Sequence, residues 1–356
     1  MQAVVFHDRG DVRVEERPVP EPRPGEVLVQ ITSAGVCGSD VGEVDHGPVL
    51  IPRQTPHPVV GLVGPLVMGH EWAGRVVGVG AGVDNLHPGQ LVASGSGVSC
   101  GDCAWCRRGQ TNLCANYWTL GFQRDGGLAE FCRAPAEVCV PVDEDRITED
   151  AAGLAQPLSI ATHSVRRGNP LSGSDVAIIG AGGIGSFMVA ALRALTDVAD
   201  ILIVEPDAVR RDIAIAMGAT HAVTPAELDR AAGYSTVYEA SGSKAGLATA
   251  LDLVVKGGTI VLVGLQQPGI EGDLLRQVSF RELSLVGPNA HVLRADFPDA
   301  LRVLASRDDW SPVAPHMHPL REAPAVFDAY AQRRATAIKT LFDPRTDHVR
   351  GARYRC

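Results

Sequence analysis

A glycine-rich loop constrains this chain of 356 residues more than any other feature of its sequence. The motif GAGGIG follows the apolar run 176–179 and precedes a stretch with helical periodicity. In such a loop the first glycine permits a tight turn, the second lets the backbone approach a pyrophosphate, and the third allows close helix–strand packing. The free N–H groups at the start of the helix then bind the phosphates. The predicted cofactor-binding residues of the loop are Gly180, Gly182, Gly183, Ile184 and Gly185.

An acidic residue at the end of the next apolar run favours NAD over NADP. Glu205 follows ILIV, and a carboxylate in this place accepts hydrogen bonds from the adenosine ribose and repels an added phosphate. Two simpler interpretations stay open. The glycine loop would serve helix–strand packing alone, and Glu205 would be a solvated acid at the end of a strand. Arg210 and Arg211 come next and can meet a 2′-phosphate, so NADP remains a second possibility. Two further cofactor contacts are assigned after a later strand, at Val263 and Leu265.

The pattern of apolar runs predicts an α/β fold with two domains. Residues 1–157 carry short β-type runs broken by Gly and Pro, which indicates an irregular β domain. Residues 158–290 alternate near-continuous apolar strands with helical stretches, as in a doubly wound parallel sheet. Residues 291–356 end in an apolar strand, 337–342, that we expect to return to the first domain. The predicted strands of the second domain are 175–180, 201–205, 236–240, 259–264 and 284–287.

Two helices of the second domain are predicted from their end signals. Ser243 is a candidate N-cap, and Gly257 is the expected terminator of the helix that follows it. Thr224, Pro225 and Glu227 have the order of residues that begins another short helix.

Composition narrows the class of partner. The chain is 45% hydrophobic and 21% charged, which is typical of a folded globular protein. A net charge of −9 makes a nucleic-acid partner improbable. The charged, proline-rich start lacks the apolar segment of a secretory signal, and no apolar run has the length of a membrane span. We therefore expect a cytoplasmic protein with a small-molecule partner and neither a membrane nor a nucleic acid.

Four of the eight cysteines have the spacing of a metal site. They follow the pattern C-x2-C-x2-C-x7-C inside the loop 95–116, and four thiolates complete a tetrahedral zinc shell that serves structure. Disulfides and an iron–sulfur cluster are the alternatives, and the missing export signal disfavours the first. The predicted ligands are Cys100, Cys103, Cys106 and Cys114. The remaining cysteines without ligand spacing are Cys132, Cys139 and Cys356.

A second metal set lies upstream of the quartet. Cys37 stands in GVCGSD, and His70 with Glu71 stands in GHEWAG. A thiolate and an imidazole supply two ligands of an open zinc site, which usually has a third protein ligand and one exchangeable position. Taken alone, Cys37 is an ordinary buried thiol and His70 is an ordinary histidine. Together with the quartet and the glycine loop, they indicate a catalytic zinc.

These motifs and their order resemble the zinc-dependent medium-chain dehydrogenase/reductase (alcohol dehydrogenase) family over about residues 1–344. The long segment between Cys37 and His70 is similar to the one in the polyol and 2,3-butanediol dehydrogenase branch. The resemblance implies a GroES-like catalytic domain, an inserted Rossmann NAD-binding domain, and an active site in the cleft between them. It also implies a homodimer or homotetramer.

Two positions depart from the family pattern. Gln156 stands where polyol-type relatives have a glutamate ligand, so either Gln156 or Glu71 is expected to be the third zinc ligand. Gly42 stands where relatives have the histidine that ends a proton relay, and it carries no proton. Ser39 would then relay the alcohol proton to a ribose hydroxyl and water, or to His46, which is otherwise an ordinary loop histidine.

The resemblance also implies supporting roles around the zinc. Asp40 is expected to orient His70, because a metal-bound imidazole needs a partner on its other nitrogen. Lys339 is expected to pair with Asp40.

The sequence thus predicts an oxidoreductase with two zinc ions and NAD. It would convert a secondary alcohol (a diol, polyol, cyclitol or sugar) to a ketone, or catalyse the reverse. The rivals are an NAD(P)H-dependent reductase of an activated double bond or imine without a working catalytic zinc, and an inactive cofactor-binding protein.

Overall fold

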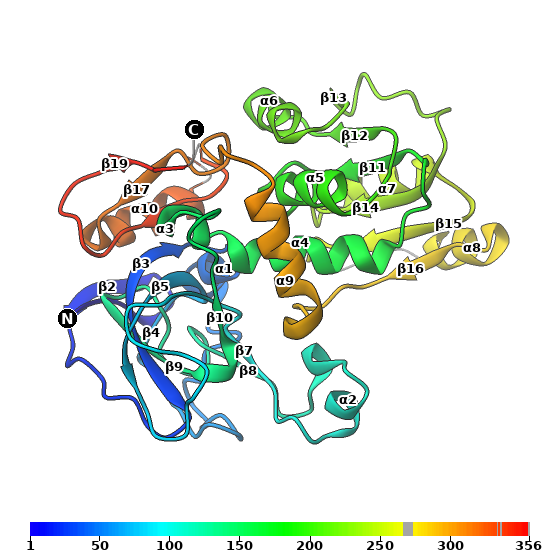
Figure 1. Ribbon diagram of the computed structural model, residues 1–356. Helices are drawn as coiled ribbons and strands as arrows, with labels where there is room; N and C mark the ends of the chain where they lie inside the picture. Colours follow the sequence, from blue (N-terminus) through cyan, green and yellow to red (C-terminus); the bar gives the residue numbers. More distant parts are fainter. Residues whose placement is uncertain (266–272, 333, 335–336, 355–356) are drawn as a thin grey trace. The chain divides into compact units, whose positions relative to one another are not determined.

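The chain folds into two units that interrupt each other in sequence (Figure 1). The computed structural model describes residues 1–265, 273–332, 334 and 337–354. Unit 1 comprises Met1–Gln156, Val292–Phe297 and Arg307–Cys356. Unit 2 comprises Pro157–His291 and Pro298–Ser306.

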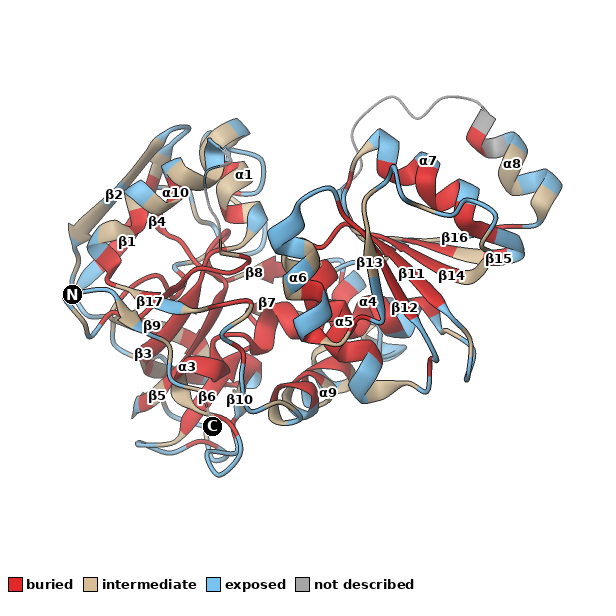
Figure 2. Ribbon diagram, turned by 90° about the horizontal axis from the view of Figure 1, so that it is seen from above, coloured by how far each residue is buried: buried red, intermediate tan, exposed pale blue. Residues whose placement is uncertain are grey.

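Unit 2 is built on a parallel sheet of six strands in the order β13-β12-β11-β14-β15-β16. All four residues of β11 and all four of β12 are buried, because helices cover both faces of the sheet. Figure 2 shows α5 on one face and α7 on the other. The strands are β11 (Val176–Ile179), β12 (Ile201–Val204), β13 (His221–Val223), β14 (Tyr234–Glu239), β15 (Val254–Leu262) and β16 (Ser284–Val286).

Local capping explains where several helices of unit 2 begin and end. Ser243 caps α7 as predicted, since its hydroxyl accepts a hydrogen bond from the Gly246 N–H at 2.9 Å. Asp207 caps α6 in the same way, and Gly218 ends that helix with a φ of 114°. The helices are α5 (Gly183–Leu195), α6 (Ala208–Met217), α7 (Lys244–Leu253) and α8 (Asp273–Arg281). Two others begin in unit 1 and continue in unit 2, α4 (Ala155–Gly168) and α9 (Leu293–Ala305).

Two local predictions for unit 2 were wrong. The helix capped by Ser243 ends at Leu253, where β15 begins at once, so Gly257 lies inside a strand with a φ of 75°. Thr224 does accept a hydrogen bond from the Glu227 N–H, but the segment forms a turn instead of a helix. The short strand β13 at the sheet edge was not predicted, because its three residues carry no clear alternation.

Unit 1 is an irregular β structure with mainly antiparallel pairing. Its larger sheet has the order β10-β6-β5-β3-β18-β17-β19, with β9 also on β3. These strands are β3 (Glu26–Gly35), β5 (Glu71–Val79), β6 (Leu91–Ser94), β9 (Phe131–Pro135), β10 (Cys139–Pro141), β17 (His316–His318), β18 (Leu341–Phe342) and β19 (Arg350–Gly351). A second sheet has the order β2 (Asp11–Glu16), β1 (Gln2–Asp8), β4 (Leu66–Val67). A third sheet pairs β7 (Gly97–Val98) with β8 (Trp118–Thr119).

Short helices connect the strands of unit 1. The α-helices are α1 (Gly38–His46), α2 (Ala104–Arg107), α3 (Glu149–Ala152) and α10 (Ala323–Ala331). The 3₁₀ helices are η1 (Thr111–Leu113), η2 (Ala136–Val138) and η3 (Leu320–Glu322). The core of the unit is apolar and includes Phe6, Ile31, Trp72 and Phe342.

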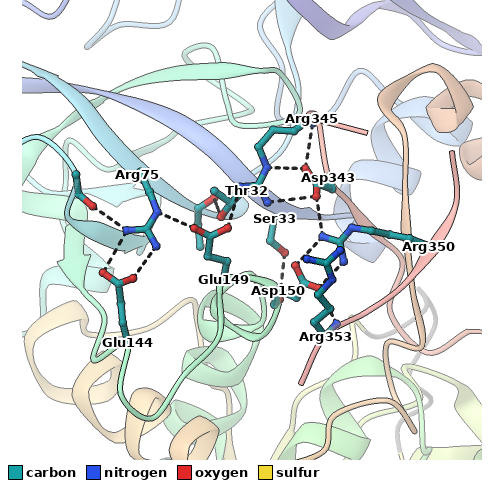
Figure 3. Close-up of polar contacts among 12 residues, drawn as sticks. Thr32, Ser33, Arg75, Glu144, Glu149, Asp150, Asp343, Arg345, Arg350 and Arg353 are labelled. Atoms are coloured by element: carbon teal, nitrogen blue, oxygen red, sulfur yellow. Dashed lines mark hydrogen bonds and ion pairs between the residues drawn. The ribbon is translucent and has the colours of Figure 1, made fainter. Parts of the chain in front are cut away.

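The C-terminal segment closes unit 1 through an ion-pair network (Figure 3). The strand β18 pairs with β3, as the predicted return of the chain requires, but it is shorter than predicted. Beyond it, the Arg350 guanidinium holds both oxygens of Asp150, at 2.7 and 2.8 Å, and also Asp343 at 2.7 Å. Burial raises the pKa of Asp343, but hydrogen bonds from Arg345 and Arg350 outweigh burial and lower it. The network therefore ties the C-terminal segment to α3.

Within the described part of the chain, no helix has both the length and the apolar character needed to cross a bilayer.

Candidate active site

Three potential metal-ligating side chains of unit 1 lie together, from two separate motifs. Cys37 immediately precedes α1, while His70 precedes β5 and Glu71 begins it. Their ligand atoms all lie within 4.8 Å of one another. Cys37 is half-buried, whereas His70 and Glu71 are buried. A thiolate and an imidazole in this arrangement fit a zinc ion with an open position.

Asp40 contacts both Cys37 and His70. It is fully buried in the first turn of α1. Its Oδ2 accepts a hydrogen bond from the Cys37 N–H at 2.9 Å, and its Oδ1 lies 3.2 Å from Nδ1 of His70. Burial lowers the pKa of His70, but the Asp40 carboxylate and the Cys37 sulfur outweigh burial, so the pKa is raised well above its usual value. Because Nδ1 is engaged by Asp40, the ring presents Nε2 to a metal.

Lys339 pairs with Glu71, so its predicted pairing with Asp40 was wrong. The Lys339 ammonium donates to both carboxylate oxygens of Glu71, at 2.9 and 2.7 Å, and to the Val36 carbonyl at 3.0 Å. Lys339 is 5% exposed and Glu71 is 1% exposed. Burial lowers the pKa of Lys339, but the Glu71 carboxylate outweighs it and the pKa is raised. Glycine is required at Gly35, because a Cβ there would lie 2.5 Å from Glu71 Oε2.

Two further contacts of His70 were not anticipated from the sequence. The Ser96 hydroxyl donates to the His70 carbonyl, and the Phe122 ring lies 4.8 Å from the imidazole between centroids. Neither Ser96 nor Phe122 belongs to a sequence pattern that points to the histidine. Only the fold brings them to the histidine.

The four predicted structural-zinc ligands form a second cluster in unit 1. Their sulfur atoms lie within 4.8 Å of one another. Cys103 and Cys106 are 3.5 Å apart, as are Cys100 and Cys114. A tetrahedral zinc with bonds of about 2.3 Å separates its sulfur ligands by about 3.8 Å, so the set fits that ion.

Backbone groups of the same loop set the acidity of these thiols. Backbone N–H groups of Cys106 and Ala115 lower the pKa of Cys103 to about 6. Burial raises the pKa of Cys114 to about 12, although its sulfur accepts from the Cys100 and Asn116 N–H groups. The N–H groups that contact these sulfur atoms therefore come from the loop itself.

Unit 2 has a cavity of about 370 Å³ at the glycine loop. Gly180 adopts a φ of 97°, and a Cβ at Gly185 would lie 2.1 Å from the Gly180 carbonyl oxygen. At Gly182, which lines the cavity, a Cβ would meet nothing within 4 Å. The three glycines thus have the turn, the open approach and the close packing that a dinucleotide site requires.

Comparisons with known proteins decide the family. The models of two families, "Alcohol dehydrogenase GroES-like domain" and "Zinc-binding dehydrogenase", match residues 23–144 and 183–306. Sorbitol dehydrogenase from Gallus gallus is 31% identical over 359 residues, which cover 96% of each protein. The chain belongs to the zinc-dependent medium-chain alcohol dehydrogenase family. The resemblance and the fold class predicted from the sequence are thereby confirmed.

Solved structures agree with this assignment. The structure of 2R,3R-butanediol dehydrogenase from Bacillus subtilis has a TM-score of 0.87 and 27% identity, and covers 96% of this chain and 99% of its own. A zinc-binding dehydrogenase from Sinorhizobium meliloti 1021, solved with NADP, has a TM-score of 0.85 and 27% identity, with coverage of 96% and 99%. The dehydrogenase is thus an oxidoreductase of a class that uses zinc and a nicotinamide cofactor.

In this dehydrogenase, the residues predicted to contact the adenosine divide into two groups. Glu205 is 5% exposed and lines the cavity, where its carboxylate accepts from the Ala181 N–H at 2.8 Å and the Asp207 N–H at 3.0 Å. Arg210 lines the same cavity, and no acceptor for its guanidinium lies among the described residues. Arg211 instead donates to the carbonyls of Glu205 and Pro206, so its role is structural.

Another part of the cavity wall, which includes Ser241 and Ser243, was not predicted from the sequence. Glu239, fully buried at the end of β14, accepts hydrogen bonds from the N–H groups of Ser241 and Gly242. It thereby shapes the turn that carries Ser241 and Ser243 into the cavity lining. The predicted contacts Val263 and Leu265 do not line this cavity, and Leu265 is 93% exposed.

The departures from the family pattern are visible in unit 1 of the dehydrogenase. Ser39 lies half-buried in the first turn of α1, and no described residue hydrogen-bonds its hydroxyl. At Gly42, one turn further, a Cβ would meet nothing within 4 Å. His46 ends α1 with a side chain that is 76% exposed and paired with Asp45. Gln156 is buried in the first turn of α4.

The cysteines without ligand spacing lie outside both clusters. Cys132 and Cys139 are buried, and burial raises the pKa of both thiols, that of Cys139 to about 12. Cys356 lies outside the described residues.

Proposed function

We propose that this dehydrogenase oxidises a secondary alcohol of a diol, polyol, cyclitol or sugar to a ketone, or catalyses the reverse, with NAD. The observation that carries the proposal is that the ligand atoms of Cys37 and His70 lie within 4.8 Å of each other, with Asp40 engaging both residues. The named relatives act on sorbitol and on 2,3-butanediol, which fits a substrate with neighbouring hydroxyl groups.

Cys37 and His70 would hold the catalytic zinc. The metal, when bound, would supply Lewis-acid polarisation that lowers the pKa of the substrate hydroxyl. The third ligand is Gln156 or Glu71. We favour Gln156, because Lys339 already neutralises both oxygens of Glu71 and so weakens that carboxylate as a donor. Zinc affinity should then fall more in Q156A than in E71Q, as measured by competition with a chromophoric chelator.

Ser39 would move the proton. Its hydroxyl has no competing partner among the described residues, so its Oγ is free to accept the proton of the substrate hydroxyl. Gly42 offers no second proton acceptor, and His46 is directed to solvent beside Asp45. With the cofactor bound, Ser39 would pass the proton on to a ribose hydroxyl and to water.

NAD would occupy the cavity of unit 2, with its phosphates on the glycine loop. The buried carboxylate of Glu205 disfavours the added phosphate of NADP. Arg210 opposes that preference, because its guanidinium lines the same cavity without an acceptor. Comparing kcat/KM with NAD and with NADP tests the assignment, and R210Q should lower the ratio of NADP to NAD activity further.

The quartet of cysteines would bind a structural zinc, so that each chain holds two zinc ions. Metal analysis by mass spectrometry tests this number. A single zinc per chain that survives in C37S would instead favour a reductase of an activated double bond or imine. The relatives' family also makes a homodimer or homotetramer the expected assembly, which light scattering on the purified protein can measure.

A panel of diols, polyols, cyclitols and sugars is the direct test of the function. The panel is run with NAD and NADP, before and after treatment with a chelator. Zinc-dependent reduction of NAD by at least one secondary alcohol is the expected result. Turnover that survives complete zinc removal would contradict the proposal, and absence of any turnover with zinc restored would favour an inactive cofactor-binding protein.

A further inference from the structure

The extended segment between Cys37 and His70 forms one wall of a pocket away from the metal ligands. Its residues 57–62 make a tight turn, closed by hydrogen bonds from the His57 N–H to the Leu62 carbonyl at 3.0 Å and from the Gly61 N–H to the His57 carbonyl at 2.8 Å. Val60, Gly61 and Leu62 line a cavity of about 470 Å³ that belongs wholly to unit 1. None of the assigned zinc ligands or cofactor contacts lines it.

The other walls of this pocket carry an excess of positive charge. Among the described residues that line it, Asp125 is the one carboxylate, and it already accepts a hydrogen bond from the Val67 N–H at 2.9 Å. The lining arginines are Arg17, Arg23, Arg124 and Arg133. Four guanidinium groups around one cavity favour an anionic ligand.

The hydrogen-bonding capacity of these arginines is only partly used. Arg23 is exposed, and no described residue accepts a hydrogen bond from its guanidinium. Arg17 pairs with Glu15 through Nη2 at 3.2 Å, whereas its buried Nε has no partner. Buried donors without a partner are rare, because each costs about 1–3 kcal/mol of desolvation. An acceptor supplied by a ligand would satisfy the Arg23 guanidinium.

The two remaining arginines are held rigidly in place. Arg124 and Arg133 share the nearly buried Glu26, at 3.1 and 3.2 Å. Arg124 also lies over the Trp118 ring, 5.0 Å from its centroid. One carboxylate between two guanidinium groups leaves a net positive charge, and fixed side chains lose little entropy when a ligand binds.

We propose that this arginine pocket binds the phosphate group of a small phosphorylated metabolite, at a site separate from the cofactor site of unit 2. A phosphate offers several acceptors in the geometry that guanidinium groups match in pairs. The cavity has room for a sugar attached to the phosphate. The extension 47–65 then has a binding role that the dehydrogenase reaction does not require.

Calorimetric titration of the whole protein, loaded with zinc, tests the pocket. The probes are inorganic phosphate and a hexose 6-phosphate. The test variant is R23Q, because Arg23 is exposed and makes no side-chain contact that folding requires. The matched control is R9Q, since Arg9 is an exposed arginine of the same unit that does not line the pocket.

We expect R23Q to weaken phosphate binding about tenfold, the usual effect of losing one charge-assisted hydrogen bond, and R9Q to leave it unchanged. The double variant R17Q/R23Q should weaken it further. Binding of both probes supports a site for the phosphate group itself, and binding of the sugar phosphate alone supports a phosphorylated metabolite. The proposal fails if neither probe binds the wild-type protein, or if the affinities of R23Q and R9Q agree within about twofold.

Discussion

The two ligand clusters of unit 1 differ in where their support comes from. The cysteine quartet lies in one loop, and the N–H groups that contact its sulfur atoms come from the same loop. Cys37 and His70 stand 33 positions apart, and their supporting charges are Asp40 and, through Glu71, Lys339 from the C-terminal segment. The first cluster is a local structure, whereas the second depends on the whole unit.

This difference supports the proposal that the mixed cluster, and not the quartet, is the catalytic one. Four thiolates fill a tetrahedral shell and leave no position for a substrate. The mixed cluster offers fewer strong donors, and Ser39, two residues after Cys37, carries a hydroxyl group that no described residue engages. Buried charges around it must be compensated, which Asp40 and Lys339 accomplish. Variants that damage one cluster should therefore leave the function of the other measurable.

The largest effect is expected from C37S. The variant removes a thiolate from the open site, so the stabilisation of negative charge on the substrate oxygen is lost. We expect turnover to fall by at least about a thousandfold, equivalent to about 4 kcal/mol. NAD affinity, measured by fluorescence titration, should stay unchanged, and zinc content should fall from two ions to one. Wild-type turnover in C37S would refute the mechanism.

The next largest effect is expected from breaking the buried ion pair with K339M. The change leaves the Glu71 carboxylate, 1% exposed, without its ammonium partner. Removal of one member of a buried pair costs about 3–5 kcal/mol of unfolding free energy. Chemical denaturation followed by circular dichroism measures this cost. The double variant K339M/E71Q removes both charges and should recover most of the loss, so equal instability of the two variants would count against a compensating pair.

The distinction between local and long-range support also decides how much of the structure could be predicted from the sequence. The cysteine quartet and the glycine loop are local patterns, and their geometry follows from spacing alone: Gly185 does approach the Gly180 carbonyl as closely as the motif requires. The pairing of Asp40 with His70 was predicted because a metal-bound imidazole needs a partner on its other nitrogen, and it is found at 3.2 Å. The supporting residues Ser96 and Phe122 were not predictable, because neither has a local pattern that points to the histidine.

The wrong predictions also concern contacts between residues that lie far apart in the sequence. Lys339 was assigned to Asp40, but a partner 268 residues away cannot be chosen from sequence when two buried acids compete for it. Gly257 has the φ of a helix terminator, yet the chain enters β15 three residues earlier, since parallel pairing with β14 begins at Val254. Tertiary pairing overrode the local signal there.

A smaller effect is expected from D40N, which weakens the orientation of His70. The variant keeps the shape of the side chain but removes the negative charge beside Nδ1. Loss of a carboxylate behind a metal-bound imidazole lowers metal affinity or activity about 10–100-fold. Steady-state kinetics at fixed free zinc measures the change. D45N is the matched control, because Asp45 lies on the same helix but pairs with the exposed His46; equal losses in both variants would show that the effect belongs to α1 as a whole.

The smallest effect on turnover is expected from C103S in the quartet. Loss of one thiolate should release the structural zinc and loosen the part of the loop 95–116 around the thiols, where Cys100 and Trp105 are exposed. We expect kcat per folded molecule to stay within about twofold, with a loss of about 1–2 kcal/mol in stability and faster proteolytic cleavage of the loop. C37S should show the reverse pattern, with an intact loop and no turnover. If C103S instead abolished turnover while the protein stayed folded, the two clusters would be coupled, and the separation of a local structural site from a unit-wide catalytic site would not hold.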